Sequence, residues 1–516
     1  MADIVLATLN ARFSHASFGL RYLLANLGDL QPRAALLEFE IKTPTGKAVE
    51  AIRVQRPRIL ALGVYVWNAE PSLALVKAVR QAVPEALIVL GGPEVSHETD
   101  QQEICRLADY VVTDEGDLAF PVLCRQLLDG TPPTNRIIRG GFVNVRNVAL
   151  PYHLYTDDDI AHRVIYVEAS RGCPFSCEFC LSSLDVPVRR FPLEKLFPAF
   201  QDLLDRGVRH FKFVDRTFNL SIKYSLELLS FFLERYEPGI FMHFEMIPDR
   251  LPPELREILS FFPRGSLQFE VGIQTFNEDV AARIKRRQDY TKTAENMRWL
   301  RKETGAHLHA DLIVGLPGED RASFARGFDR LLALDPQEIQ VYILKRLRGT
   351  PIARHDAEFQ MRYQPGPPYE LLSNRDLSED DVAALHRFAR FWDLYVNSGN
   401  YLDTAPLIWQ GAASPFHAFY RFCDWLTARW GRAHSISIDE SAEALFLWLT
   451  DELGNPQEET AQKIWRDMCR AVPRNRPAFL RSYVDVEASR GQRAAHLKGL
   501  QRQARRKHAP PSQSSD

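Results

Sequence analysis

Two long stretches of this sequence alternate short apolar runs with amphipathic segments, and this alternation constrains the fold most. In the first stretch, Leu73, Val76, Val79 and Val83 recur at helical spacing between two apolar runs. Short buried strands that alternate with helices predict an α/β domain with a doubly wound, Rossmann-like parallel sheet. The predicted strands of this domain cover 4–9, 35–39, 59–64, 87–90 and 110–112.

The second stretch contains six further strand–helix units. Six such units in about 180 residues predict a closed or partly closed parallel barrel, a (βα)6 partial TIM barrel. The predicted strands cover 164–167, 210–214, 240–246, 267–273, 309–314 and 339–344. The predicted helices between them cover 193–204, 222–236, 253–261, 293–304 and 321–334.

Beyond residue 350 the strand signals fade and capped helices predict a third, mostly α-helical domain. Ser378 with Asp381 forms a capping-box pattern, and Ser414 followed by Pro415 begins another helix that ends near Gly431. We therefore predict five segments: a first domain over 1–130, a linker over 131–155, the barrel over 156–355, helices over 370–490, and a basic disordered tail over 491–516.

Charge and composition indicate a globular chain without an obvious nucleic-acid partner. Its 516 residues are 45% hydrophobic and 25% charged, and the net charge is −2. No signal-like segment is seen, and no apolar run approaches the ~20 residues needed to cross a bilayer, so we expect no membrane partner and a cytoplasmic location. Three of the seven cysteines lie within eight residues, which in a reducing compartment favours a metal-binding or catalytic site.

These three cysteines occur in SRGCPFSCEFC, directly after the first predicted barrel strand. Active sites of such barrels lie at the carboxyl ends of the strands. Thiolates of Cys173, Cys177 and Cys180 can ligate three irons of a cubane cluster and leave the fourth iron open. The spacing differs from that of zinc ribbons, and a structural zinc site or three packed cysteines are the alternatives.

The segment CPFSCEFC, with Phe179 in the aromatic position, resembles the signature of the radical S-adenosylmethionine superfamily. The resemblance implies a 4Fe-4S cluster on the three cysteines, whose open iron is chelated by S-adenosylmethionine. One electron from a reductase such as flavodoxin or ferredoxin would then release a 5′-deoxyadenosyl radical.

The same resemblance implies roles for residues at other strand ends. Asp215 in FVDRTFN stands where the family has a Gly-Gly-Glu-like segment for the methionine ammonium, although the glycines are missing. Glu270 and Gln274 would contact the methionine or ribose. The adenine would lie near three residues of the last two strands: Gly315, Tyr342 and Leu344.

Residues 1–130 resemble the cobalamin-binding module that often precedes such barrels. The resemblance rests on LGVYVWN, LGGPEVS and DYVVTDEGDLAF. Gly91 and Gly92 would let a bulky ligand approach the backbone, and Tyr65 and Trp67 offer flat apolar surface. The cofactor-binding residues predicted here are Asn10, Tyr65, Trp67, Gly91, Gly92 and Glu115.

This module departs from the family pattern at one position. Many cobalamin modules carry Asp-x-His-x-x-Gly, but when Gly19 is aligned with its glycine, Ser14 and Ala16 occupy the other two positions. We therefore assign no lower axial histidine, although His15 is one residue away. The segment also lacks the Gly-x-Gly-x-x-Gly pattern of dinucleotide-binding sheets.

The combined resemblance predicts a cobalamin-associated radical enzyme that methylates an unactivated carbon of a small-molecule or peptide substrate. A rearrangement or cyclisation with the same cofactors and a non-catalytic cobalamin or iron–sulfur sensor are the alternatives. A tRNA methylthiotransferase is disfavoured, because that group has three further cysteines in its leading domain, whereas this one has only Cys105 and Cys124.

Overall fold

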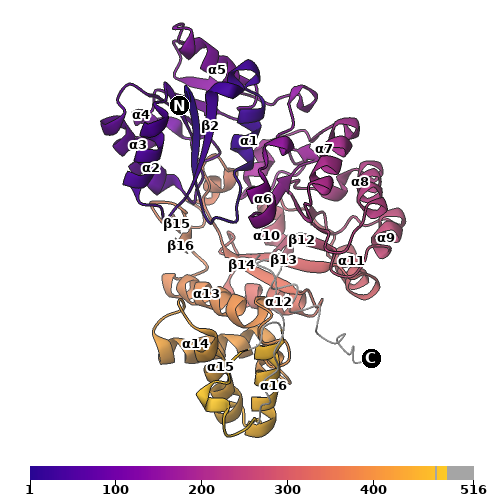
Figure 1. Cartoon of the computed structure of the whole chain (residues 1–516). Helices are drawn as coiled ribbons and strands as arrows, with labels where there is room; N and C mark the ends of the chain where they lie inside the picture. Colours follow the sequence, from indigo (N-terminus) through magenta and orange to yellow (C-terminus); the bar gives the residue numbers. More distant parts are fainter. Residues whose placement is uncertain (471–473, 485–516) are drawn as a thin grey trace.

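The computed structural model describes residues 1–470 and 474–484 of the chain. It contains two parallel sheets with their helices, followed by a helical region that Figure 1 shows at the opposite end from the first sheet. The predicted basic tail, residues 491–516, lies outside the described residues. No described helix is both long and apolar enough to span a membrane.

The first sheet has the strand order β2-β1-β3-β4-β5-β6, with all neighbours parallel. Separate apolar cores lie on its two faces, which confirms the doubly wound prediction. Its strands are β1 Ile4–Asn10, β2 Ala34–Glu40, β3 Ile59–Gly63, β4 Leu87–Gly91, β5 Tyr110–Thr113 and β6 Ile137–Arg139. Its helices are α1 Phe18–Ala25, α2 Thr45–Gln55, α3 Ala69–Ala82, α4 Glu103–Leu107 and α5 Ala119–Leu128.

The predicted linker is wrong in part, because β6 lies inside it. This three-residue strand pairs with β5 and extends the sheet by one edge strand. Two of its three residues are exposed, so the sequence lacks the buried apolar run that identifies the other strands.

The second sheet has the order β14-β13-β12-β11-β10-β7 and is also parallel. All six predicted barrel strands are confirmed, and the barrel is only partial, because β7 and β14 are its two edges. Its strands are β7 Ile165–Val167, β10 His210–Phe213, β11 Phe241–Met246, β12 Leu267–Gln274, β13 His307–Val314 and β14 Glu338–Ile343. The helices are α7 Leu193–Asp205, α8 Ile222–Glu234, α9 Pro253–Ser260, α10 Glu278–Arg283, α11 Tyr290–Glu303 and α12 Arg321–Leu332.

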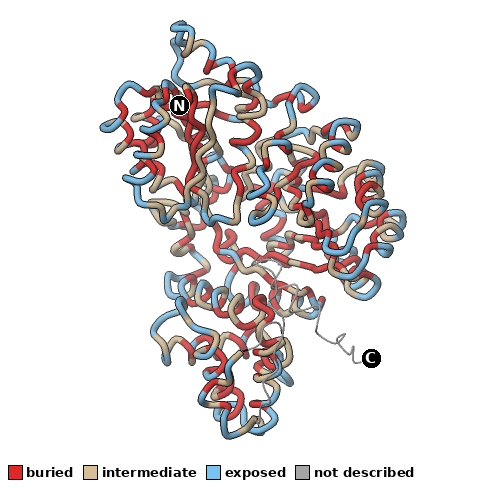
Figure 2. The backbone as a smooth tube through the Cα atoms, viewed as in Figure 1, coloured by how far each residue is buried: buried red, intermediate tan, exposed pale blue. Residues whose placement is uncertain are grey.

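The two faces of the second sheet differ in chemistry. Phe244, Phe269 and Ala310 are fully buried and belong to the main apolar core. The alternate residues on β11, β12 and β13 are polar: His243, Glu245, Gln268, Glu270, His309 and Asp311. Because side chains alternate along a strand, the polar residues share the concave face of the partial barrel. Figure 2 shows buried strands inside and exposed helix surfaces outside.

The third region packs directly on the barrel. Phe328 of α12 makes edge-to-face contacts with Phe388 and Trp392 of α13, and Phe416 of α14 completes this aromatic group. The helices are α13 Glu379–Trp392, α14 Pro415–Trp430, α15 Ile438–Leu447 and α16 Gln457–Cys469. The predicted caps at Ser378 and Ser414 are confirmed, and the aromatic residues form one core with the barrel.

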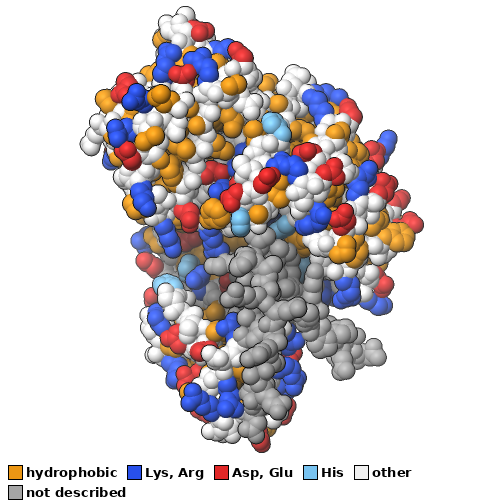
Figure 3. Space-filling model, in the orientation of Figure 1, with side chains coloured by type: hydrophobic (Ala, Val, Ile, Leu, Met, Phe, Trp, Pro, Cys, Tyr) orange, Lys and Arg blue, Asp and Glu red, His pale blue; other side chains and the backbone are white. Residues whose placement is uncertain are grey.

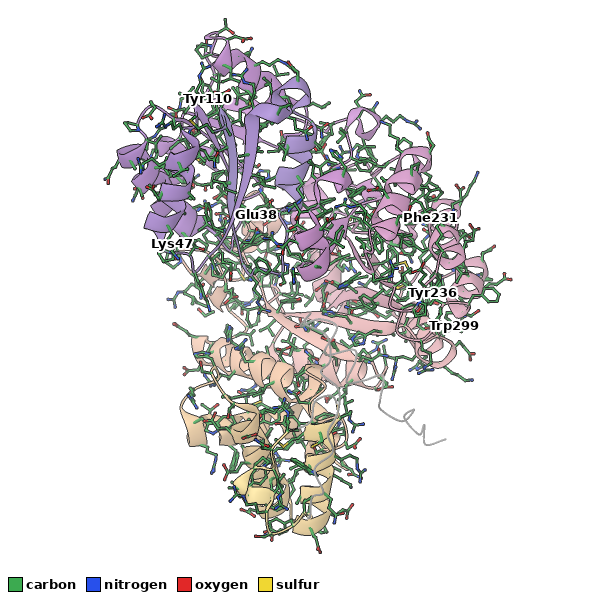
Figure 4. All side chains as sticks on the ribbon, in the orientation of Figure 1. Glu38, Lys47, Tyr110, Phe231, Tyr236 and Trp299 are labelled. Atoms are coloured by element: carbon green, nitrogen blue, oxygen red, sulfur yellow. The ribbon has the colours of Figure 1, made fainter. Side chains whose placement is uncertain are left out.

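Ion pairs join the first domain to the barrel. Acidic residues at the carboxyl-end edge of the first sheet meet arginines of the barrel, and Figure 4 labels Glu38 at this boundary. The pairs are Glu38–Arg163, Asp117–Arg171, Glu115–Arg189 and Glu94–Arg348. The carboxyl-end edge of the first sheet therefore faces the barrel. Elsewhere, Figure 3 shows both signs of charge interspersed over the visible surface.

Candidate active site

The loop after β7 carries the three cysteines, and backbone hydrogen bonds hold it in place. The Cys173 N–H donates to the Asp185 carbonyl oxygen at 2.9 Å. Gly172 before it has φ +89°, and a Cβ there would lie 2.8 Å from that same oxygen, so the close approach requires glycine. A short antiparallel pair, β8 Ser170–Arg171 with β9 Arg189–Arg190, closes the base of the loop.

All three cysteines line one cavity of about 220 Å³ at the carboxyl end of the second sheet. The guanidinium of Arg286 donates to the Cys177 sulfur at 3.6 Å. Among the described residues, no group of three or more His, Cys, Asp or Glu is arranged for a single metal ion. Three thiols along one wall match the donor set of a cubane cluster with one open iron. The other polar lining residues include Arg216, Glu245, Glu270, Gln274, Arg287, Gln288 and Asp311.

Three carboxylates of neighbouring strands share this cavity. Burial raises the pKa of Glu245 and of Asp311, although Arg216 and His309 respectively oppose the rise. Burial has the same tendency at Glu270, but the hydrogen bond from His243 and the charge of His309 lower its pKa overall. The cavity wall therefore combines these carboxylates with the guanidinium groups of Arg216, Arg286 and Arg287 next to the cysteines.

An arginine–carboxylate pair stands beside the cysteine loop. Arg216, just after β10, contacts Glu245 of β11 at 2.6 Å. Glu245 is the main cause that raises the pKa of Arg216, and Arg216 lines the same cavity as Cys180. The pair presents one cation and one anion side by side within the cavity.

Of the residues predicted around the cysteines, Phe179, Glu270 and Gln274 line the same cavity. Gln274 has φ +73°, and the pairing of β12 with β13 shifts register between Gly272 and Gln274. Such a bulge re-aims a side chain at the end of a strand, here towards the cavity.

The prediction for Asp215 is not supported by its position. Its carboxylate is buried and accepts hydrogen bonds from the Ala169 N–H at 2.9 Å and the Ser170 hydroxyl at 2.6 Å. Burial raises its pKa to about 7 despite these bonds. Asp215 therefore holds the strand end that leads to Cys173 and does not line the cavity.

Gly315 and Leu344, which were predicted to lie near the adenine, instead contact other parts of the chain. Gly315 has φ +88°, and a Cβ there would overlap the side chain of Leu371. The N–H of Leu344 donates to Val314 and its carbonyl accepts from Leu371. Tyr342 is different, because it faces the concave side and remains 44% exposed.

A second pocket, of about 270 Å³, lies at the carboxyl-end edge of the first sheet. Four of the residues predicted to bind cobalamin line it: Tyr65, Gly91, Gly92 and Glu115. Two barrel residues, Glu168 and Arg171, complete the wall. Because Arg171 lies two positions before Cys173, this pocket and the cysteine cavity are joined by one short segment.

Four of the residues predicted to bind cobalamin have partners within the protein. Gly92 has φ +107°, and a Cβ would overlap the Val64 carbonyl oxygen, so the fold itself requires glycine. Glu115 accepts from Arg189 at 2.7 Å and 2.8 Å and from the Val143 N–H. Asn10 donates to His15 and Glu38. Trp67 stacks on Tyr65 at 4.4 Å and is half exposed.

His15 lies between the domains. Its ring contacts the Tyr166 hydroxyl at 2.6 Å, and burial followed by Lys212 lowers its pKa. The Nδ1 atom of the imidazole therefore has a partner on the barrel.

Sequence analysis missed Glu245, Asp311 and Arg286. The sequence does contain a signal for Glu245 and Asp311, because polar residues alternate with apolar ones in FMHFEM and HLHADLIV. Parallel strands that are buried on both faces are instead apolar throughout. Arg286 has no such signal, because it reaches Cys177 from a loop after α10.

Comparison with known families identifies the domains. The family described as the Radical SAM superfamily matches residues 167–331, the B12 binding domain matches 4–124, and a protein family of unknown function, DUF4080, matches 357–509. The chain is therefore a radical S-adenosylmethionine protein with an amino-terminal B12 binding domain and a carboxy-terminal DUF4080 domain.

Individual relatives agree with this assignment. The chain is 26% identical to the cobalamin-dependent radical SAM methyltransferase TokK of Streptomyces tokunonensis over 333 residues, or 58% of this chain and 48% of TokK. It is also 26% identical to 2-(S-pantetheinyl)-carbapenam-3-carboxylate methyltransferase of Streptantibioticus cattleyicolor over 369 residues, 64% of this chain and 53% of that enzyme. The chain thus spans about half the length of these relatives.

Solved structures share the fold. The cobalamin-dependent radical enzyme OxsB in its apo form has a TM-score of 0.60 at 13% identity, over 90% of this chain and 74% of OxsB. The methyltransferase TsrM from Kitasatospora setae, solved with tryptophan and a SAM analogue, has a TM-score of 0.57 at 17% identity, over 71% of this chain and 80% of TsrM.

Proposed function

We propose that the chain is a cobalamin-associated radical enzyme that cleaves S-adenosylmethionine reductively and transfers a methyl group to an unactivated carbon. One observation carries the proposal: the cysteine cavity and the pocket of the B12 binding domain are joined by the segment that contains Glu168 and Arg171. A radical formed at one site would therefore act close to a cofactor at the other.

The residues of the cysteine cavity fit the expected groups. Cys173, Cys177 and Cys180 would hold a 4Fe-4S cluster, which supplies the electron for cleavage when bound. Arg216 and Glu245 suit the carboxylate and ammonium of the methionine moiety, because an adjacent cation and anion complement a zwitterion. This pair takes the role that sequence analysis gave to Asp215.

The pocket of the first domain suits an apolar portion of cobalamin. Tyr65 and Gly91 line it together with the buried side chains of Leu20, Val89 and Phe120. Cobalamin, when bound, supplies the methyl group. We propose a cytoplasmic location and a flavodoxin- or ferredoxin-type electron donor, since a cluster with thiolate ligands needs reducing conditions.

The decisive experiment uses the full chain, purified without oxygen from cobalamin-supplied cells, with iron and cobalt counted. With S-adenosylmethionine and a low-potential reductant, we expect 5′-deoxyadenosine from the wild type and none from Cys177→Ala. Cys423→Ala, which changes a buried cysteine of the third region, should retain iron and activity.

Three results would change the proposal. Cobalt near zero beside a filled iron site would remove cobalamin, and a filled cluster that yields no 5′-deoxyadenosine would favour a sensor. S-adenosylhomocysteine formed together with 5′-deoxyadenosine on the true substrate would favour methyl transfer. Its absence would favour rearrangement or cyclisation.

A further inference from the structure

Glu178 lies between two of the cluster cysteines and is fully buried, with 0% of its side chain exposed. Its carboxylate accepts from Arg354 at 2.7 Å and His355 at 2.8 Å, and it contacts Lys285 at 3.1 Å. A buried, ionised carboxylate with three basic partners is costly unless the arrangement is well formed.

The partners come from parts of the barrel that the sheet does not join. Lys285 follows α10, whereas Arg354 and His355 lie in a turn, Pro351–His355, beyond β14. The backbone of Glu178 adds two bonds: its N–H donates to Ile284 at 3.0 Å, and its carbonyl accepts from Ile352 at 2.9 Å. Since β7 and β14 do not pair, Glu178 connects the loops across this gap.

The charges of this group lie next to the cysteine loop. Lys285 and Arg354 are half exposed, at 51% and 52%, yet both reach the buried carboxylate. Arg286, adjacent to Lys285, donates to the Cys177 sulfur. Net charge and hydrogen bonds to sulfur are among the factors that set the reduction potential of an iron–sulfur cluster.

We propose that Glu178 is a positioning residue that fixes the cysteine loop and that, together with Lys285 and Arg354, it sets the reduction potential of the cluster. This rests on the proposed function, because it needs a cluster on the three cysteines. Reduction takes one electron from an external donor and adds one negative charge to the cluster. Loss of the Glu178 charge therefore favours the reduced form, and loss of a neighbouring positive charge disfavours it.

The test is a redox titration of the reconstituted full chain, with dithionite as reductant, mediator dyes and the electron paramagnetic resonance signal of the reduced cluster as readout. At a fixed applied potential, Glu178→Gln should raise the ratio of reduced to oxidised cluster by about tenfold. Lys285→Met and Arg354→Met should lower the ratio. Iron per chain should equal that of the wild type.

Shifts of opposite sign in the ratio of reduced to oxidised cluster indicate an electrostatic effect. A general loosening of the cysteine loop would instead shift the ratio in the same direction in every variant. Asp467→Asn is the matched control, because Asp467 is equally buried and paired with Arg470, but in the third region. It should leave the ratio unchanged. Shifts of the same sign in all three variants, or no shift in Glu178→Gln with full iron, would overturn the proposal.

Loss of iron from a variant or from the wild type also has a defined interpretation. If Glu178→Gln fails to hold iron, Glu178→Asp should restore it, and the lysine and arginine variants still test the sign of the shift. A failure of Glu178→Asp to restore iron, with unshifted Lys285→Met and Arg354→Met, counts against the proposal. A wild-type chain that binds no iron would instead refute the proposed function, and the iron count tells the two apart.

Discussion

At the scale of single residues, polar groups in the barrel are used for two different purposes. Glu245 and Glu270 remain in the cysteine cavity, whereas Asp215 is fully committed to the backbone N–H of Ala169 and to Ser170. The partners distinguish these roles, because Glu245 and Glu270 contact the side chains of Arg216 and His243 and not the backbone.

The raised pKa of Asp215 gives a pH-dependent stability with a defined sign. Its pKa is about 7 in the folded chain and 3.8 for the free side chain, so the folded state binds the extra proton between these values. Stability therefore falls as pH rises through this window, by an amount on the order of a few kcal/mol.

Asp215→Asn removes this dependence. The free energy of unfolding, measured by denaturant titration from about pH 4 to pH 7, should show that the wild type loses stability relative to the variant as pH rises. A difference between the two that stays constant over this range would contradict the prediction.

At the scale of elements, the turns after the strands decide where ligands can approach. Gly92, after β4, has φ +107° and leaves no room for a Cβ beside Val64. Gly172 and Gly315 are constrained similarly beside the cysteine loop and Leu371. Each glycine therefore fixes a loop at the carboxyl end of a sheet.

Gly92→Ala should destabilise the chain by about 1–3 kcal/mol, because the new Cβ overlaps backbone and the conformation is strained. Thermal unfolding of the full chain measures the loss. Gly46→Ala is the matched control, since a Cβ there meets nothing within 4 Å and the backbone needs no positive φ. Equal stability of the two variants would contradict the prediction that the backbone at Gly92 requires glycine.

At the scale of the whole molecule, largely buried ion pairs hold the first domain on the barrel. The acid stands on the first domain and the arginine on the barrel in the pairs of Glu115 with Arg189 and Glu94 with Arg348. These side chains are at most 20% exposed, so removal of one partner leaves an uncompensated charge.

Arg189→Gln should therefore cost about 3 kcal/mol of stability, whereas the double variant Glu115→Gln/Arg189→Gln should recover part of the loss. Arg53→Gln, in an exposed pair with Glu50, should leave the stability almost unchanged. Chemical unfolding of the four proteins measures these effects. The prediction fails if Arg189→Gln behaves like Arg53→Gln.

The sequence by itself determined the architecture and the cysteine site. Eleven strands were predicted from apolar runs, and three cysteines in a fixed spacing after the first barrel strand define their own loop. Such signals are local: a period of two or 3.6 residues, or ligands a few residues apart, can be read without knowing what lies nearby. The exposed strand β6 was not predicted because it lacks a buried apolar run.

Only the tertiary structure decided which polar residues share the cysteine cavity. Arg216 and Glu245 meet although 29 positions separate them, and Glu178 meets Arg354 across 176 positions. The direction of a side chain and its partners depend on how strands and loops pack, so a carboxylate such as Asp215 and one such as Glu245 look alike in sequence. Packing makes the first a support for the backbone and leaves the second in the cavity, beside the three cysteines.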